Sequence, residues 1–126
     1  MKWLYNQGFI AAGEVTLPNG RRADVIGHDE EGKIVIIEVK TAVNNFKNDE
    51  KWQNYLDFCD EFYFLVGFPL YHYYHRKDTE QAGLLLERGR TLEIIEKDRL
   101  GHKTNNREKI MHLVRRTLSR KYVFGY

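Results

Sequence analysis

Two acids and one lysine stand where they could act together on a phosphate ester. Glu38 and Lys40 lie two residues apart at the end of the strongly apolar segment 33–40, and Asp24 lies on the preceding predicted strand. Successive side chains of a strand point to opposite faces, so Glu38 and Lys40 share one face. Carboxylates can hold a divalent cation and an ammonium group can stabilise developing negative charge, which is chemistry suited to phosphodiester hydrolysis.

The first turn of the chain sets which residue faces Asp24. Residues 18–20 (Pro-Asn-Gly) match a three-residue hairpin loop, in which proline begins a type I turn and glycine takes the left-handed position. This loop pairs Leu17 with Arg21, and therefore Glu14 with Asp24. A two-residue Asn-Gly loop would put Glu14 on the opposite face, and we favour the longer loop because it uses the proline as a turn residue.

The acidic segment around Gly32 predicts a second hairpin. If its loop has five residues, His28 pairs with Ile34, and counting back along both strands pairs Asp24 with Glu38. The three acids are then expected side by side on three neighbouring strands, on the face that also carries the lysine.

Such a cluster is costly without a counter-ion. Two unit charges about 4 Å apart repel by about 4 kcal/mol at an effective dielectric constant of about 20. A divalent cation would neutralise the excess negative charge, and oxygen ligands without nearby Cys or His favour Mg²⁺, Mn²⁺ or Ca²⁺ over zinc. Lys40 would then stabilise charge on a phosphate or orient the attacking water. The alternative interpretation is a strand whose Glu and Lys side chains only face solvent.

The rest of the sequence predicts the elements that hold these residues. Helical turns are expected within residues 1–10, strands at 14–17, 22–26, 33–40, 61–66, 84–86 and 92–96, a helix from Asp49 to about Phe58, a long loop at 67–82, and a last helix with a capping box at Asn105 and Glu108. The segment 33–40 is typical of a central strand buried on both faces. The order of elements predicts an α/β fold with a mixed β-sheet flanked by helices.

The composition fits one domain spanning residues 1–126. The chain is 42% hydrophobic and contains two prolines, with no stretch that resembles a linker. No apolar run approaches the roughly 20 residues that span a bilayer, so no membrane partner is expected. The N-terminus lacks the apolar region of a signal peptide, and the single cysteine, Cys59, excludes an internal disulfide, so we expect a cytoplasmic protein.

At these residues the sequence resembles the PD-(D/E)xK nuclease superfamily, which has the restriction-endonuclease-like fold. The matching motif is Asp24 followed by Glu38-Val39-Lys40 on the next strand, with Glu14 upstream. More narrowly, the chain is similar to the MmcB-type family of DNA-repair endonucleases. The stretches that carry this similarity are residues 17–26, 37–40 and 51–64.

The resemblance implies roles for individual residues. Asp24 and Glu38 would hold a Mg²⁺ or Mn²⁺ ion, and the carbonyl of Val39 would be a third ligand. Lys40 would be the catalytic lysine and Glu14 a further acidic residue of the site. The second half of the chain, including the segment 71–75, departs from any pattern of the family, which leaves the choice of substrate open.

Several residues near the motif are candidates for contact with nucleic acid. Arg21 and Arg22 flank the first turn, and Thr41 follows the predicted strand end. Lys51 and Tyr55 lie one helical turn apart and could reach a scissile phosphate. Each has a structural alternative: arginines that solvate a hairpin, a threonine that only ends a strand, a surface lysine and a half-buried tyrosine.

The C-terminal segment is strongly basic. Residues 99–126 contain eight Lys or Arg and one acid, Glu108. Arg115 and Arg116 fall outside the apolar stripe of the predicted last helix, so they are expected to contact the DNA backbone without reading its sequence. The alternative is a basic helix face that only keeps the protein in solution.

Together these features predict a metal-dependent DNA endonuclease with a role in DNA repair, in which water activated by Mg²⁺ or Mn²⁺ attacks the phosphorus. The alternative is a non-catalytic nucleic-acid-binding module on the same fold. An RNA nuclease is a third hypothesis, since the metal site does not distinguish the two sugars. The oligomeric state is left open.

Overall fold

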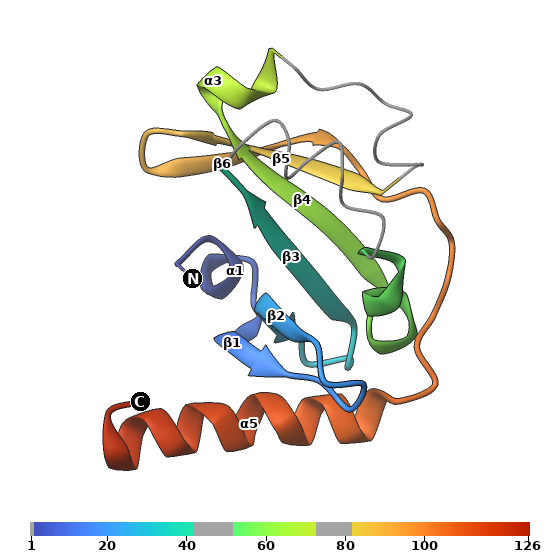
Figure 1. Ribbon diagram of the computed structural model, residues 1–126, viewed down its shortest axis with the longest axis vertical. Coiled ribbons are helices and arrows are strands. Elements are labelled where there is room, and N and C mark those ends of the chain that lie inside the picture. Colours follow the sequence, from blue (N-terminus) through green and yellow to red (C-terminus); the bar gives the residue numbers. More distant parts are fainter. Residues whose placement is uncertain (1, 42–51, 73–81) are drawn as a thin grey trace.

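A computed structural model describes residues 2–41, 52–72 and 82–126 (Figure 1). In chain order the elements are α1 (Lys2–Asn6), β1 (Ile10–Thr16), β2 (Arg22–His28), β3 (Ile34–Lys40), the 3₁₀ helix η1 (Trp52–Phe58), β4 (Glu61–Gly67), α3 (Phe68–Tyr71), β5 (Gly83–Arg88), β6 (Thr91–Glu96) and α5 (Arg107–Phe124). Within these ranges no helix is both long and apolar enough to cross a membrane.

The six strands form one mixed sheet in the order β1-β2-β3-β4-β5-β6. The first three strands pair antiparallel, β4 pairs parallel with both β3 and β5, and β6 returns antiparallel. The predicted α/β fold with a mixed sheet flanked by helices is therefore confirmed. In β3 the side chains of residues 34–38 are all buried, as expected for a central strand covered on both faces.

Both predicted hairpin registers are confirmed. The N–H of Leu17 donates to the Arg21 carbonyl across the three-residue loop, at 2.7 Å, and Gly20 has the expected positive φ of 85°. In the second hairpin, His28 pairs with Ile34 across a five-residue loop. Glycine is needed at the left-handed position because a side chain there would strain the backbone.

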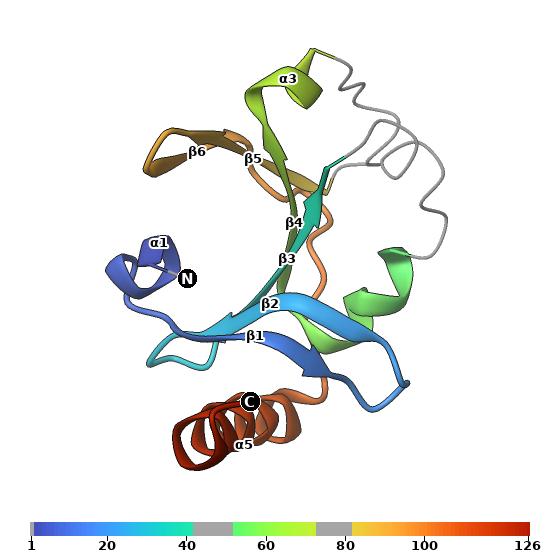
Figure 2. The same ribbon diagram turned by 60° about the vertical axis from the view of Figure 1, so that its left-hand side comes forward.

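The core has two parts, one on each face of the sheet. One cluster packs η1 and α5 against the strands, and the other packs Leu4 of α1 against β3, β4 and β5. Figure 2 shows α1 and the η1 segment on opposite sides of the sheet. Along α5, Ile110, Val114 and Thr117 are buried, which confirms the predicted apolar stripe.

The helices differ in detail from the predictions. Residues 52–58 form a 3₁₀ helix, in which Trp52, Tyr55 and Phe58 are buried at the three-residue period of that helix. Asp49, the predicted N-cap, lies outside the described residues. Residues 68–71, predicted as loop, form the short helix α3, which begins where proline can occupy the first turn.

The start of the first strand and the start of the last helix also differ from the predictions. β1 begins at Ile10, four residues earlier than expected, because it pairs with the whole length of β2 as far as His28. The N-cap of α5 is Asn106 and it makes no side-chain capping bond, so the predicted capping box is wrong. The Asn106 side chain instead donates to the Asp57 carbonyl at 3.1 Å and ties α5 to η1.

Candidate active site

Asp24 and Glu38 lie opposite each other where the β2–β3 ladder ends. The last backbone pair before them joins Val25 with Ile37. Beyond it, the N–H of Asp24 donates to Glu38 Oε1 at 3.2 Å, and the N–H of Val39 donates to Asp24 Oδ2 at 2.9 Å. Each carboxylate thus accepts a backbone N–H from the opposite strand, which fixes the two acids side by side.

Glu38 is buried, with 7% of its surface exposed. Burial raises its pKa to about 8, and the hydrogen bond and negative charge of Asp24 act in the same direction. The backbone N–H of Asp24 and the charge of Lys40 offset part of this effect. Near neutral pH the Glu38 carboxyl group therefore holds a proton unless another cation takes its place.

Lys40 lies beside this pair. It follows Glu38 by two residues on β3, and its charge acts on the pKa of Glu38. Its Nζ atom lies 5.7 Å from the centre of the Phe64 ring, and Phe64 is the parallel partner of Glu38 on β4. The structure therefore places the predicted lysine next to the carboxylates, partly covered by an aromatic ring.

Tyr55 reaches the same site from η1. Its hydroxyl donates to the Arg22 carbonyl at 3.2 Å, and its ring lies 5.8 Å from Phe62. Burial and then the charge of Glu38 raise the pKa of Tyr55 to about 12, partly offset by the charge of Arg21. The hydroxyl consequently stays protonated at physiological pH and serves as a hydrogen-bond donor beside the carboxylates.

Glu14 is not brought into contact with the other two acids. It faces Asp24 in the register, but its φ of 56° is left-handed, and its side chain is exposed without a hydrogen bond or ion pair among the described residues. Ala12 and Val15, three residues apart, are buried in the same cluster, so the alternation of side chains is broken between them. A left-handed non-glycine residue is strained, and such residues often occur at functional sites.

Three of the other predicted contact residues, Arg21, Arg22 and Thr41, lie within three residues of Asp24 or Glu38 along the chain. Arg21 is half-buried and close enough to act on the Tyr55 hydroxyl, whereas the side chains of Arg22 and Thr41 are exposed. The first turn is held against η1 because Asn19 donates to the Asn54 carbonyl at 3.0 Å. Lys51 lies outside the described residues.

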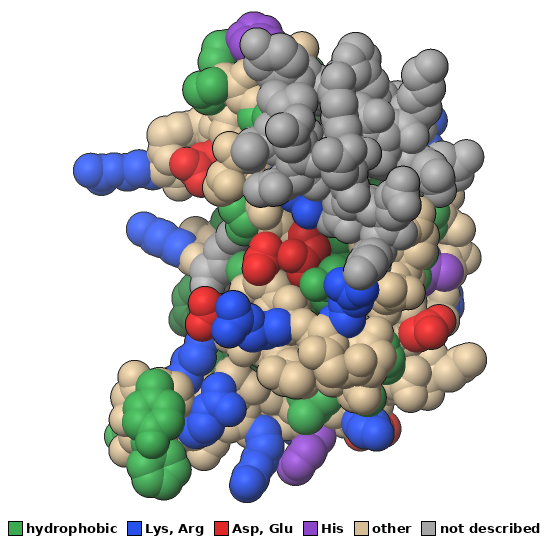
Figure 3. All heavy atoms as spheres, viewed as in Figure 1, with side chains coloured by type: hydrophobic (Ala, Val, Ile, Leu, Met, Phe, Trp, Pro, Cys, Tyr) green, Lys and Arg blue, Asp and Glu red, His purple; other side chains and the backbone are tan. Residues whose placement is uncertain are grey.

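Arg115 and Arg116 are exposed on α5, which packs against β1 and β2. The helix is tied to the sheet by Lys121, whose ammonium group donates to the Gly13 carbonyl at 2.8 Å. Sequence reasoning counted Lys121 only as part of a basic segment, because its contact depends on the irregular backbone of β1. Figure 3 shows acidic side chains gathered in the middle of this face, with Lys and Arg side chains around them.

The donor set fits a hard divalent cation. Among the described residues no group of three or more His, Cys, Asp or Glu side chains converges, so the centre consists of two carboxylates. Mg²⁺ is commonly held by one or two carboxylates, with waters and substrate phosphates completing its shell. A buried carboxylate with a raised pKa next to a second carboxylate is a place where such a cation would relieve the repulsion.

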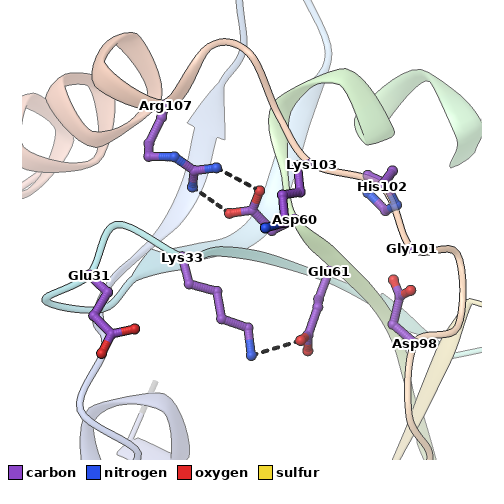
Figure 4. Close-up of a pocket in the computed structure, with 9 residues that line it drawn as sticks. All are labelled: Glu31, Lys33, Asp60, Glu61, Asp98, Gly101, His102, Lys103 and Arg107. Atoms are coloured by element: carbon purple, nitrogen blue, oxygen red, sulfur yellow. Dashed lines mark hydrogen bonds and ion pairs between the residues drawn. The ribbon is translucent and has the colours of Figure 1, made fainter.

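A pocket of about 480 Å³ lies at the other end of β3 and β4 (Figure 4). Arg107 forms paired hydrogen bonds with Asp60, and Lys33 forms an ion pair with Glu61 at 2.7 Å. Asp60 also accepts the N–H of Ile34 at 2.8 Å. Among the acids that line this pocket, Asp60 joins α5 to the sheet and Glu61 pairs with Lys33, and we assign both a structural role.

The fold and the site define an α/β protein with a two-carboxylate, one-lysine centre at the end of neighbouring strands. The chain belongs to the MmcB-like family of DNA repair proteins, whose model, described as DNA repair protein MmcB-like, matches residues 1–122. The predicted MmcB-like family of DNA repair proteins is therefore confirmed, whereas endonuclease activity and membership of the PD-(D/E)xK superfamily stay predictions.

The fold is shared with a solved structure, the SPO1766 protein of unknown function from Silicibacter pomeroyi. It is 26% identical in sequence, with a TM-score of 0.83 over 96% of this chain and 82% of that one. A search of the curated proteins finds no match.

Proposed function

We propose that this protein is a Mg²⁺- or Mn²⁺-dependent DNA endonuclease of the PD-(D/E)xK superfamily that acts in DNA repair. The observation that carries the proposal is the pairing of Asp24 with Glu38 across two strands, with Lys40 beside them. Membership of a family of DNA repair proteins supports DNA as the substrate.

In this proposal Asp24 and Glu38 hold the cation, and the carbonyl of Val39 is a further ligand. The bound cation would polarise the phosphate and lower the pKa of the water that attacks it. Two carboxylates leave room in the coordination shell for water and for a phosphate oxygen, which a substrate site needs.

Lys40 and Tyr55 act on the substrate in different ways. The Lys40 ammonium group stabilises the negative charge that grows on the phosphate oxygens as the phosphodiester bond breaks. The Tyr55 hydroxyl remains protonated and donates its one hydrogen to the Arg22 carbonyl, so it can accept a hydrogen bond from a bound water but does not serve as a base.

The cations around the site would hold the DNA backbone. Arg21, Arg22 and Thr41 lie nearest to the carboxylate pair, and the basic face of α5 with Arg115 and Arg116 extends the positive surface. Such contacts hold phosphates in any sequence and weaken as salt is raised. Lys51 keeps its predicted role in contacting the scissile phosphate.

Calorimetry of Mn²⁺ binding and nicking of supercoiled DNA together test the proposal. Asp24→Asn should abolish both, because it removes a ligand charge while keeping an oxygen to accept the Val39 N–H. Lys40→Ala should leave Mn²⁺ binding in place and lower nicking by about 100-fold or more, the scale of losing one transition-state contact. Asp57→Asn and Lys97→Ala, both at exposed positions away from the site, are the matched controls.

The outcomes separate the candidate functions. Wild-type protein that binds DNA but cuts no duplex, branched or single-stranded DNA with Mg²⁺ or Mn²⁺ would favour a non-catalytic binding module. Cleavage of an RNA strand in preference to the DNA strand of the same sequence would move the substrate to RNA. Failure of wild-type protein to bind Mn²⁺ would overturn the metal site itself.

A further inference from the structure

The C-terminal end of α5 carries exposed aromatic side chains that the proposed catalytic site does not use. Tyr122, Phe124 and Tyr126 are 92%, 65% and 77% exposed. The sequence after Glu108 contains no further acid, whereas it contains five Lys or Arg. Large exposed apolar groups on a basic surface indicate an interaction site rather than a face that only contacts water.

Two arginines and two aromatic residues at the C-terminal end of the chain form one continuous surface. Arg116, Arg120 and Phe124 follow each other at intervals of four residues, so they lie along one side of the helix over about 12 Å. They line the same surface groove, and the backbone carbonyl of Tyr126 accepts a hydrogen bond from Arg120 Nε at 3.0 Å. We refer to Arg116, Arg120, Phe124 and Tyr126 as the α5 strip.

The rings in the α5 strip are available for stacking. The centres of the Phe124 and Tyr126 rings lie 6.4 Å apart, with their planes tilted by 36°. The two rings are therefore not closed against each other in a parallel stack, and both are mostly exposed. Proteins commonly bind unpaired nucleotides through aromatic rings beside arginines, because every base can stack on a ring and every nucleotide carries a phosphate that an arginine can bind.

The helix that carries the α5 strip approaches the backbone of β2 near Asp24. Lys121, on the same helix, donates to the Gly13 carbonyl at 2.8 Å. A Cβ atom added to Gly13 would lie 3.8 Å from Lys121 Nζ and 3.5 Å from the carbonyl oxygen of Asp24. Figure 3 shows hydrophobic side chains at the C-terminal end of α5, with Lys and Arg side chains between them and the acidic group in the middle of the face.

We propose that the α5 strip binds the unpaired bases of a single-stranded DNA segment whose phosphates continue toward Asp24 and Glu38. Phe124 and Tyr126 stack on bases, while Arg116 and Arg120 hold phosphates. A duplex hides its base faces and cannot use the rings, so this site selects DNA with a single-stranded part. The inference rests on the proposed function in taking DNA as the partner.

Charge favours DNA over a second copy of the chain. A two-fold dimer through this surface would set the same patch on both sides of the interface. Arg116 and Arg120 of each copy would then face like charges, with no acid after Glu108 to offset them. The phosphates of single-stranded DNA would instead neutralise the two arginines, and the bases of the same strand could stack on the rings.

Fluorescence anisotropy in EDTA tests the proposal without any cleavage. The probes are a labelled oligothymidylate and a labelled hairpin duplex with the same number of phosphates. Phe124→Ala with Tyr126→Ala should weaken binding of the single strand by about tenfold and change duplex binding by less than about twofold. Arg116→Ala with Arg120→Ala should weaken both and reduce the salt slope for the single strand by about 1.4.

Tyr5→Ala is the matched control, since Tyr5 is an aromatic residue on α1 that is 77% exposed and lies outside the α5 strip. It should leave both affinities unchanged. Equal losses on both probes, or no loss on the single strand, would overturn the proposal. So would a dimer, measured by light scattering, that Phe124→Ala with Tyr126→Ala dissociates without changing the affinity for the single strand.

The two proposals can fail separately. Binding in EDTA does not depend on the metal site, so loss of the ring contribution contradicts only the α5 strip. A protein that selects single strands in EDTA but never cuts DNA with Mg²⁺ or Mn²⁺ would contradict the endonuclease and leave the α5 strip standing.

Discussion

The backbone N–H of Asp24 donates to the Glu38 carboxylate at 3.2 Å, and the N–H that follows Glu38 donates to the Asp24 carboxylate at 2.9 Å. Beyond the last backbone pair of β2 and β3, the two strands are thus joined by hydrogen bonds from backbone N–H groups to acidic side chains. The same contacts that hold the strands together hold two negative charges side by side, so protons, metal ions and stability are coupled at this point.

Binding of Mn²⁺ at pH 7 should release about one proton, because Glu38 is mostly protonated without a cation and must lose its proton to bind one. The apparent affinity should rise with pH up to about 8, the pKa of Glu38. Calorimetry in buffers of different ionisation enthalpy measures the proton count. Enthalpies that are the same in all buffers would contradict this prediction, and Glu38→Gln should bind weakly without releasing a proton.

In EDTA, wild-type protein should lose stability as pH rises between 4.5 and about 8. The pKa of Glu38 is higher in the folded than in the unfolded chain, so the folded state holds more protons in this window and a rise in pH favours unfolding. The loss should be about 3 kcal/mol after allowance for partial solvent access. Urea unfolding of wild type and Glu38→Gln checks it, since only the wild type should show this component.

Tyr55→Phe should lower the free energy of unfolding by about 1 kcal/mol, because the Arg22 carbonyl loses its hydrogen-bond donor while the ring keeps its packing against Phe62. Under the proposed function it should also slow DNA nicking and leave Mn²⁺ binding within about twofold, since the hydroxyl is a donor and not a metal ligand. Urea unfolding and nicking assays measure the two effects. Loss of Mn²⁺ binding in Tyr55→Phe would contradict this role.

Asp60→Ala should destabilise the protein by about 3 kcal/mol, because it leaves Arg107 and two backbone N–H groups, those of Ile34 and Thr104, without their acceptor. Although burial acts to raise it, the hydrogen bonds hold the pKa of Asp60 below its usual value. This stabilisation is therefore present above pH 3.8 and is lost as the pH falls further.

Urea unfolding across the acid range measures both parts of the Asp60 prediction. Asp57→Ala, an exposed acid nearby, is the control and should change stability little. An Asp60 variant as stable as the control would show that the pocket in Figure 4 does not join α5 to the sheet.

Gly83→Ala should destabilise the protein by about 2 kcal/mol. Gly83 pairs with Tyr63 in the parallel β4–β5 ladder, and an added Cβ atom would lie 2.2 Å from two atoms of the Tyr63 ring. Tyr63→Leu should rescue part of the loss, which a double-mutant cycle by urea unfolding would detect. Strictly additive effects of the two changes would contradict direct contact as the cause.

The sequence by itself determined the sheet and the meeting of the two acids. Turn chemistry at residues 18–20 and around Gly32 fixed the registers of both hairpins, because glycine alone adopts the left-handed backbone cheaply and loop length then sets every later pair. Asp24 and Glu38 were therefore predictable as neighbours from counting residues. Hydrophobic patterns located β3 and the buried side of α5 for the same kind of local reason.

Tertiary structure decided the rest of the site. The left-handed backbone at Glu14 broke the alternation on which its predicted position depended, and no local signal announces it. The same holds for Lys121 and Tyr55, whose contacts join segments far apart in the chain. The raised pKa of Glu38 likewise follows from burial, which depends on how the helices cover the sheet and not on the identity of neighbours in sequence.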